Sequence, residues 1–422
     1  PRQRRDLEAW RAERQRVFDQ PLEPVVKPAE ATLTLSRLRA FLLNPAQAFL
    51  QRQLYIDKDD EKADQDDDEP FYSDAASRHG ILSRLLERIV HEHAAGSEGG
   101  EERWTEALSR LYEDYRLRGK TPAGAFGAVD CDSLRRQFLG QAQGEHGLQA
   151  FLAERPPDSF QGPILLGASQ TPIGARLRFA PLELRWREGD VERQARVAGH
   201  FQYAWAAPGR LDLLCYTWKK YRLATNRLKK QALDPVLFCL TLLAHQDAAA
   251  QALVRDAAWH IHLVTGDGIC RFVYPAGAIS ADEARAYLQR LAADCLGATD
   301  LELLPLELVL EEHALYDAAT GRVPISAAAF KQELEIAIEE SRDWPRPNGW
   351  DSALLQLLDP PLPEDALDKV RRRLELLDRG PAAEPNKPRR KANNSTRAKT
   401  ATAAGKNSAR RRPTRRRSPR QS

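Results

Sequence analysis

The sequence predicts an α+β protein in which a small mixed sheet is flanked by helices. Apolar residues recur at helical spacing through most of the first 150 residues, whereas residues 164–217 alternate apolar and polar side chains. After residue 225 helical patterns return, interrupted by two further strand patterns. At 422 residues and 42% hydrophobic composition the chain can bury a sizeable core, which excludes a disordered or collagen-like protein.

The amino-terminal residues 1–31 read as the end of a preceding region. Residues 5–17 form an arginine-rich helical pattern, and Pro21, Pro24 and Pro28 then punctuate a linker. The sequence contains no Met at all, so we expect a piece of a longer protein or a removed initiator.

The first helical flank is predicted in two parts. Residues 34–54 are apolar at helical spacing, and Asn44-Pro45 should kink or split this helix. Residues 72–153 are helical again, with breaks at residues 96–100 and 121–124. Between the two parts, residues 57–69 hold nine acids and two lysines but lack the glycine and ligand spacing of a calcium loop, so we expect a solvated loop.

The strands and the second helical flank follow in order. Strands are predicted at residues 177–186, 194–205 and 210–217, then a helix at residues 227–245 with a kink at Asp234-Pro235. Further strands are expected at residues 258–264 and 271–274, and further helices at residues 281–296, 330–340 and 365–377.

The near-neutral charge, 63 basic against 60 acidic residues, conceals an asymmetry. Residues 387–420 hold 14 Lys and Arg and no acid, which leaves 63 − 14 = 49 basic against 60 acidic residues in the rest. We expect residues 381–422 to be a disordered basic tail that attracts nucleic acid without sequence preference, or that serves solubility or contacts the acidic body.

Cysteine spacing and hydropathy indicate the cellular compartment and whether a membrane span is expected. The five cysteines form no C-x-x-C pair, which fits reduced thiols in a cytoplasm and gives no sign of a zinc or iron–sulfur site. No run approaches 18 apolar residues, so no membrane span is expected.

The strand region carries the spacing of a known nuclease motif. Gly199 to Gln202 ends one strand pattern, Cys215 and Thr217 end the next, and Asp234 and Phe238 lie on the following helix. This order resembles the RecB nuclease family, in which G-x-x-D and D-x-K strands precede a Q-x-x-x-Y helix. There the two carboxylates hold Mg²⁺ and the lysine helps to position the attacking water.

Here those positions have lost their ligands. Gln202 and Cys215 replace the two carboxylates, Thr217 replaces the lysine, and Asp234 and Phe238 replace the helix residues. A Gln amide and a thiol are poor ligands for Mg²⁺. The resemblance therefore implies an inactive PD-(D/E)XK nuclease-like core, with no catalytic residue and no metal site. Asp212 could serve as a first acid only if a strand carrying D-x-K followed it, and none does.

A nuclease-like core stripped of its ligands is typical of the carboxyl-terminal domain of the RecC family, subunits of exodeoxyribonuclease V. Three further segments resemble that family: residues 33–50, residues 69–78 with Glu69-Pro70-Phe71, and residues 122–127 with the pattern P-x-G-A-F-G. Together with the strand motifs they cover residues 33–343. The resemblance implies that residues 1–31 end a helicase-like region, that residues 32–380 form the nuclease-like domain, and that the tail follows.

The resemblance also implies a function and partners. The chain would be a non-catalytic DNA-handling and scaffold subunit in double-strand-break repair, and the complete subunit would split the duplex, channel the 3′ strand and respond to Chi. RecB-like and RecD-like subunits would be its partners and would use the ATP and Mg²⁺, with no cofactor in this chain. DNA ends and single strands would be its ligands, in a nucleoid-associated, cytoplasmic setting. An active nuclease of the AddB type is the alternative, but it requires acids at Gln202 and Cys215 and usually an iron–sulfur cysteine set.

Two groups of residues are candidates for binding. His260 and His262 would share one face of a strand, but with no third ligand in sight we expect a structural or surface pair. A basic stretch interleaved with aromatic residues could hold phosphates and stack on unpaired bases, although a solvated loop explains it equally well. These predicted DNA-binding residues are Trp218, Lys219, Lys220, Tyr221, Arg222, Arg227, Lys229 and Lys230.

Overall fold

The computed structural model describes residues 30–45, 48, 71–97, 99–142, 147–167, 175–217, 225–265, 268–297, 306–311, 366–377 and 379. The predicted features that lie outside these residues are the arginine-rich helical pattern, the acidic loop, the helix at residues 330–340 and the basic tail. The domain boundaries predicted from the sequence stay predictions.

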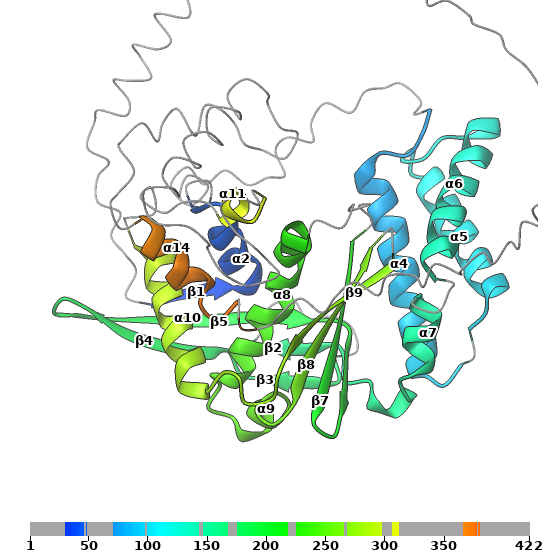
Figure 1. Ribbon diagram of the computed structural model, residues 1–422. Coiled ribbons are helices and arrows are strands. Elements are labelled where there is room, and N and C mark those ends of the chain that lie inside the picture. The colour runs from blue at the N-terminus through cyan, green and yellow to red at the C-terminus, as the bar shows by residue number, and fades with distance from the viewer. Residues whose placement is uncertain are drawn as a thin grey trace, which may run out of the picture. The chain divides into compact units, whose positions relative to one another are not determined.

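The first sheet is built around the long strand β5 (Val191–Phe201) (Figure 1). β1 (Glu30–Thr34) pairs with it in parallel, while β4 (Leu182–Glu188) and β2 (Ile164–Leu166) pair with it antiparallel. β3 (Leu177–Phe179) extends the sheet beside β2. The single strand predicted at residues 177–186 is thus wrong, because Pro181 has no N–H to donate and separates β3 from β4.

The second sheet has the order β6-β7-β8-β9. β6 (Ala204–Ala207) pairs antiparallel with β7 (Arg210–Tyr216), β8 (Ala258–Thr265) lies parallel to β7, and β9 (Gly268–Tyr274) returns antiparallel. The α+β class is confirmed, but with two small mixed sheets in place of one. Alternation tells which face a side chain takes and not which strand its own strand pairs with, so it could not separate the two sheets.

One group of helices shares the larger core with both sheets, and Leu211, Leu213 and Ile261 project into that core from one face of the second sheet. α8 (Thr225–Leu243) makes the crossover from β7 towards β8, continues through Pro235, and is followed by the short α9 (Ala248–Ala252). Four further helices complete this group, α2 (Leu35–Leu43), α10 (Ala281–Leu296), α11 (Leu306–Glu311) and α14 (Ala366–Leu374). α2 ends just before Asn44-Pro45, as predicted, and α10 begins at Ser280 with a reciprocal capping box to Glu283.

A second group of helices lies side by side in Figure 1 and has its own core. It comprises α4 (Ala75–Ala94), α5 (Glu101–Arg116), α6 (Gly124–Ala142), α7 (Leu148–Ala153) and the short 3₁₀ helix η2 (Pro157–Ser159). The predicted breaks near residues 96–100 and 121–124 are confirmed. This core includes Leu214 and Val264, which project from the opposite face of the second sheet. The sheet is therefore packed on both faces.

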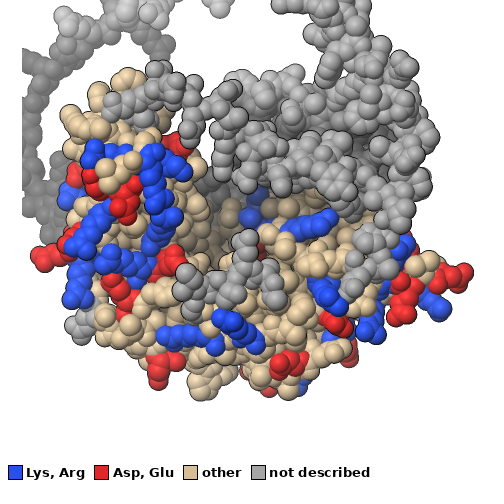
Figure 2. Space-filling model, turned by 180° about the vertical axis from the view of Figure 1, so that it is seen from behind, with Lys and Arg blue, Asp and Glu red and all other residues tan. Residues whose placement is uncertain are grey.

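The charged surface of the described residues mixes both signs. On the face in Figure 2, Lys and Arg side chains are interspersed with Asp and Glu side chains. None of the described helices combines the length and the apolar character that crossing a lipid bilayer would need.

Candidate functional site

The fold places the nuclease-like positions around the end of β7 and the middle of α8. Cys215 is half-buried and packs against the larger core, and Thr217 directly follows β7, where its N–H donates to the Val264 carbonyl at 2.9 Å. Gln202 follows the end of β5, and its carbonyl lies so close to Gly162 that an added Cβ there would meet it at 2.0 Å. Asp234 lies on α8. Its carboxylate oxygen Oδ2 is 3.4 Å from Nε of Arg39, which lies on α2.

The structure brings Cys215 and Asp234 close enough to influence each other. Burial raises the pKa of the Cys215 thiol, the Asp234 charge raises it further, and Arg39 opposes them. Burial also raises the pKa of Asp234, again against Arg39. Cys215 therefore stays a neutral thiol at pH 7, in a setting that disfavours any additional negative charge.

The helix position at which the family motif has a tyrosine, and this chain has Phe238, is apolar and fully enclosed. Phe238 is completely buried, and its ring stacks on that of Phe201 with centroids 5.3 Å apart and planes at 27°. Two stacked phenylalanine rings beside the end of β5 supply no oxygen ligand. In the described residues, the side of β7 that carries Cys215 thus packs against the larger apolar core.

Asp212 faces the opposite side of the sheet from Cys215. The two residues are three positions apart on one strand, so their side chains point to opposite faces. Asp212 is only 3% exposed and lies with the core of the second helix group, beside the parallel strand β8. It therefore cannot substitute for the carboxylate that the nuclease resemblance would place at position 215.

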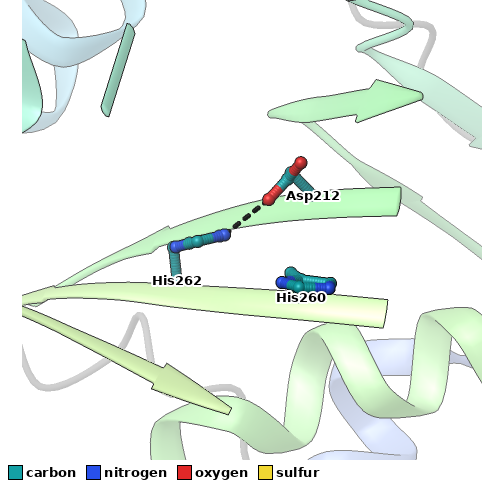
Figure 3. Close-up of side chains that lie close together, drawn as sticks. All are labelled: Asp212, His260 and His262. Carbon is teal, nitrogen blue, oxygen red and sulfur yellow. Dashed lines mark hydrogen bonds and ion pairs between the residues drawn. The ribbon is translucent and has the colours of Figure 1, made fainter. Parts of the chain in front are cut away.

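Asp212 is the centre of a buried polar cluster, which we define as Asp212, His260, His262, Arg155 and Arg210. His262 Nε2 donates to Asp212 Oδ1 at 2.6 Å (Figure 3). Arg155 Nη2 donates to the same oxygen at 2.8 Å, and Arg210 Nε lies 2.7 Å from Asp212 Oδ2. Arg155 comes from the segment after α7, which is thereby tied to the sheet. Its guanidinium also covers the Phe151 ring at 3.5 Å.

The electrostatics follow from this arrangement. Burial alone would raise the pKa of Asp212, but hydrogen bonds from His262, Arg210 and Arg155 outweigh it and hold the pKa well below its usual range. Burial lowers the pKa of His262 against the pull of Asp212. Burial and the nearby Arg210 charge lower the pKa of His260 to about 4. At neutral pH the cluster thus holds one carboxylate, two neutral imidazoles and two guanidinium ions.

The expectation that the two histidines lack a third ligand is wrong. The ligand atoms of Asp212, His260 and His262 all lie within 4.8 Å of one another, a donor set that suits a transition metal. Arg155 Nη2, however, already lies within 2.8 Å of Asp212 Oδ1 and 3.3 Å of His262 Nε2, so a guanidinium nitrogen stands where a cation would bind. A dication here would also meet the repulsion of Arg210. The cluster is best explained as a salt-bridge network that holds α7 on the sheet.

The cluster makes the stability of the fold depend on pH between 7 and 4.5. Both imidazoles have folded pKa values below the value of about 6.5 of an unfolded chain, so the unfolded chain takes up protons first and stability falls as the pH falls. We expect His260→Gln to remove about 1 kcal/mol of the loss between pH 7 and pH 5, allowing for its half-exposed ring. Urea unfolding at pH 7 and pH 5 measures this loss in the unaltered chain and in the variant. The same loss in both proteins would contradict the prediction.

The predicted DNA-binding stretch joins β7 to α8. Trp218, Lys219, Lys220, Tyr221 and Arg222 lie outside the described residues. The backbone of Arg227 and Lys229 belongs to the first turns of α8, and Lys230 is half-buried there. The DNA-binding role of all eight residues stays a prediction.

Nothing in the sequence pointed to Arg155 as a member of the cluster. It lies 57 residues before Asp212, after a short helix, and no motif marks it. The sequence also does not predict the parallel register of β7 and β8, which pairs Asp212 with His260 and Leu214 with His262.

Comparison with known proteins places the chain. The family model described as the RecC C-terminal domain matches residues 30–300. The chain is also similar to the RecBCD enzyme subunit RecC of Escherichia coli K12, at 32% identity over 112 residues. That match covers 26% of this chain and 9% of the E. coli protein. Because the family model covers well over half of the sequence, the chain belongs to the RecC C-terminal domain family.

Proposed function

We propose that this chain is the non-catalytic, DNA-handling and scaffolding part of a RecBCD-like helicase–nuclease that acts in DNA repair by homologous recombination. RecB-like and RecD-like subunits would supply the motors, the nuclease and the use of ATP and Mg²⁺. The complete subunit would split the duplex, channel the 3′ strand and respond to Chi in a nucleoid-associated, cytoplasmic complex. Family membership and the E. coli relative's printed name support this proposal.

The observation that carries the non-catalytic part is the environment of Cys215. A nuclease of this type needs a carboxylate at that position to hold Mg²⁺. Here a thiol whose pKa is raised by burial occupies it, beside the stacked Phe201 and Phe238 rings. We infer that the core is an inactive nuclease-like fold. No feature of the described residues favours the active AddB-type alternative.

DNA contact is proposed for the stretch between β7 and α8. The face in Figure 2 mixes charges of both signs, so the described surface there offers no broad basic field. The concentrated cations at residues 218–230, assisted by the basic tail at residues 387–422, are therefore the better candidates for phosphate contacts. Trp218 and Tyr221 could stack on unpaired bases.

We expect the chain to bind forked DNA in the presence of Mg²⁺ and to leave it uncut. Changing Lys219, Lys220, Lys229 and Lys230 together to Glu should weaken binding at least about tenfold at low salt, because phosphate contacts dominate the affinity. A gel-shift titration of labelled forked DNA, followed by a denaturing gel of the same samples, measures both properties.

The matched control changes the same amount of charge elsewhere. Arg110, Arg116, Arg135 and Arg136 lie on α5 and α6, exposed and paired with neighbouring acids. Their joint change to Glu should weaken binding much less. Equal loss from both sets would reject the assignment of the stretch, whereas Mg²⁺-dependent cutting would reject the non-catalytic proposal.

A further inference from the structure

An exposed apolar patch lies where the chain enters α4 and where α6 begins. It consists of Phe71, Tyr72, Phe126 and Val129, which we call the aromatic patch, and each of these side chains is between 59% and 72% exposed. The rings of Phe71 and Phe126 meet edge to face with their centroids 5.4 Å apart. Val129 follows Phe126 by one helical turn and shares its side of α6. The patch contains none of the nuclease-like positions and no member of the Asp212 cluster.

The first six residues of α6 carry no polar side chain. They read Gly-Ala-Phe-Gly-Ala-Val, from residue 124 to residue 129, and all of them except the buried Gly127 are exposed. A surface helix normally turns charged residues to solvent and apolar residues to the core. Here a Cβ added at Gly127 would clash with the Pro122 carbonyl, so the side of the helix that packs inward is glycine while Phe126 and Val129 face outward. This pattern suits a helix end that packs against another molecule.

A buried carboxylate holds both halves of the aromatic patch in place. Asp130 comes next after the apolar run of α6, and its Oδ2 accepts hydrogen bonds from the Ser73 N–H at 3.3 Å and from the Tyr112 hydroxyl at 3.0 Å. The Ser73 hydroxyl donates to the same oxygen. Phe71 and Tyr72 directly precede Ser73, so they are tied to α6 through this group. A surface that is ordered in advance loses little conformational entropy when a partner binds.

The patch is larger than the scattered apolar exposure of an ordinary surface. At these exposures its three aromatic side chains present about 400 Å², taking a whole aromatic side chain as ~200 Å². Contiguous apolar surface of that size commonly marks a binding site. It is about half of the ~800 Å² that each partner contributes to a specific protein–protein interface, so flanking polar residues can complete the contact.

The charge next to the patch indicates the kind of partner. Residues 57–69 are joined to Phe71 through Pro70 and hold nine acids and two lysines, a net charge of 2 − 9 = −7. Two residues of chain span at most about 7 Å, so covalent geometry keeps the last of these acids, Glu69, near Phe71. A partner that complements both features presents an apolar surface edged by Lys and Arg.

Three other occupants fit these observations less well. A second copy of the chain would bring the same surface against itself in a symmetric dimer, and would thus bring the two acidic segments together. A nucleic-acid strand could stack on the rings, but the acids would repel its phosphates. The basic tail at residues 387–422 complements the acids, but it holds no Leu, Ile, Val or aromatic residue with which to cover the patch.

We infer that the aromatic patch docks a partner subunit of the complex, through an apolar surface of that subunit edged by basic residues. The inference rests on the proposed function, because it assigns the scaffolding role to one surface of the chain. Phe71 and Phe126 are the anchors of this contact, since aromatic side chains bury much area with few rotatable bonds and often dominate the energy of an interface. The acidic segment steers the encounter towards the basic edge of the partner.

The test uses the full chain and, as its probe, the RecB-like and RecD-like subunits of the same organism produced together. Biolayer interferometry measures the affinity of the chain for this pair. Phe71→Ser combined with Phe126→Ser should weaken binding at least about thirtyfold, the effect of losing one interface hot spot. Both side chains are exposed, so the fold should tolerate the change, and circular dichroism checks this.

A matched pair of valines provides a smaller change and its control. Val129 lies in the patch on α6, whereas Val191 lies on β5 and is also exposed. Val129→Ser should weaken binding about threefold, as expected of a contact beside the anchors, and Val191→Ser should leave the affinity unchanged. Equal effects of the two substitutions would overturn the inference.

The basic edge of the partner is tested by changing the acidic segment. Asp66, Asp67 and Asp68, changed together to Asn, should slow association with the pair and flatten the dependence of the affinity on salt. An unchanged salt dependence would reject the basic edge, and with it the stated chemistry of the partner.

The outcomes separate this inference from the proposed function. If the unaltered chain binds the pair and the patch variants bind it equally well, the assignment of the patch is wrong while the scaffold proposal stands. If the unaltered chain does not bind the pair, the proposed function fails and the inference fails with it. A double variant that loses forked DNA but keeps the pair would show a nucleic-acid occupant. A double variant that is monomeric where the unaltered chain sediments as a dimer would show a second copy, and either result overturns the inference.

Discussion

Asp212→Ala is expected to lower the free energy of unfolding by about 3–5 kcal/mol, the usual cost of leaving a buried partner charge uncompensated. Arg155 is 5% exposed and loses its hydrogen-bonded carboxylate, and His262 loses its acceptor at the same time. Arg155 cannot reach water without breaking its contact with the Phe151 ring. Urea unfolding at pH 7, followed by circular dichroism, measures the loss.

Asp132→Ala is the matched control for this prediction. Asp132 on α6 also pairs with two arginines, Arg135 and Arg136, but its side chain is 46% exposed. Water can solvate all three charges there, so we expect a loss below about 1 kcal/mol. Similar losses in the two variants would contradict the claim that burial makes the Asp212 network strong.

A double replacement separates two contributions to the free energy of unfolding: the cost of leaving one buried charge unpaired, and the net stabilisation that the ion pair provides. Asp212→Leu combined with Arg155→Met removes both buried charges and keeps apolar volume beside Phe151. Arg210, whose side chain is 38% exposed, can turn to solvent. We expect the double variant to be more stable than Asp212→Ala, since replacing a buried ion pair by apolar groups is often nearly neutral. A double variant as unstable as the single one would show that the pair contributes specific structure.

The sequence predicted elements well where local signals were complete. The helix at residues 281–296 was predicted with its observed bounds, since Ser280 and Glu283 form a capping box before an amphipathic run. The alternation that predicted strands at Asp212 and at His260 was also correct. Each of these features depends on neighbours within a few residues.

The parts of the site that could not be predicted depend on distant residues. Arg155 reaches Asp212 across 57 positions, and His262 reaches it across 50. Parallel pairing of β7 and β8 requires the crossover through α8. The length of this crossover does not specify which residues of the two strands lie opposite each other. A lone Asp beside a strand motif could therefore be taken for a displaced nuclease ligand, whereas the fold turns it to the other face.

The nuclease-like positions themselves yield the second large effect. Cys215→Asp places a carboxylate where the proposed nuclease resemblance expects one, and we expect it to lower the free energy of unfolding by about 2–3 kcal/mol at pH 8. The new charge would lie beside Asp234, in a place where burial already raises the pKa of the thiol. Cys215→Ser is the control, because it adds a polar group of similar size without a charge.

The pH dependence of this variant follows from the same environment. A carboxyl group whose folded pKa is raised binds its proton more readily in the folded state, so the stability lost at pH 8 returns as the pH falls through that pKa. We expect most of the difference between Cys215→Asp and Cys215→Ser to disappear by pH 5. A difference that is constant with pH would point to a steric cause.

Addition of Mg²⁺ then tests whether the core is one substitution away from a metal site. Gln202 offers one amide oxygen, Thr217 replaces the lysine, and Phe201 and Phe238 fill the adjoining space with stacked rings. One new carboxylate at position 215, with Asp234 already paired to Arg39, does not supply the several oxygen ligands that a hard dication needs. We therefore expect millimolar Mg²⁺ neither to restabilise Cys215→Asp nor to cause DNA cutting. Restabilisation together with cutting would show that only the ligand at position 215 had been lost, and the inactive-core proposal would have to be replaced by that of a recently silenced nuclease.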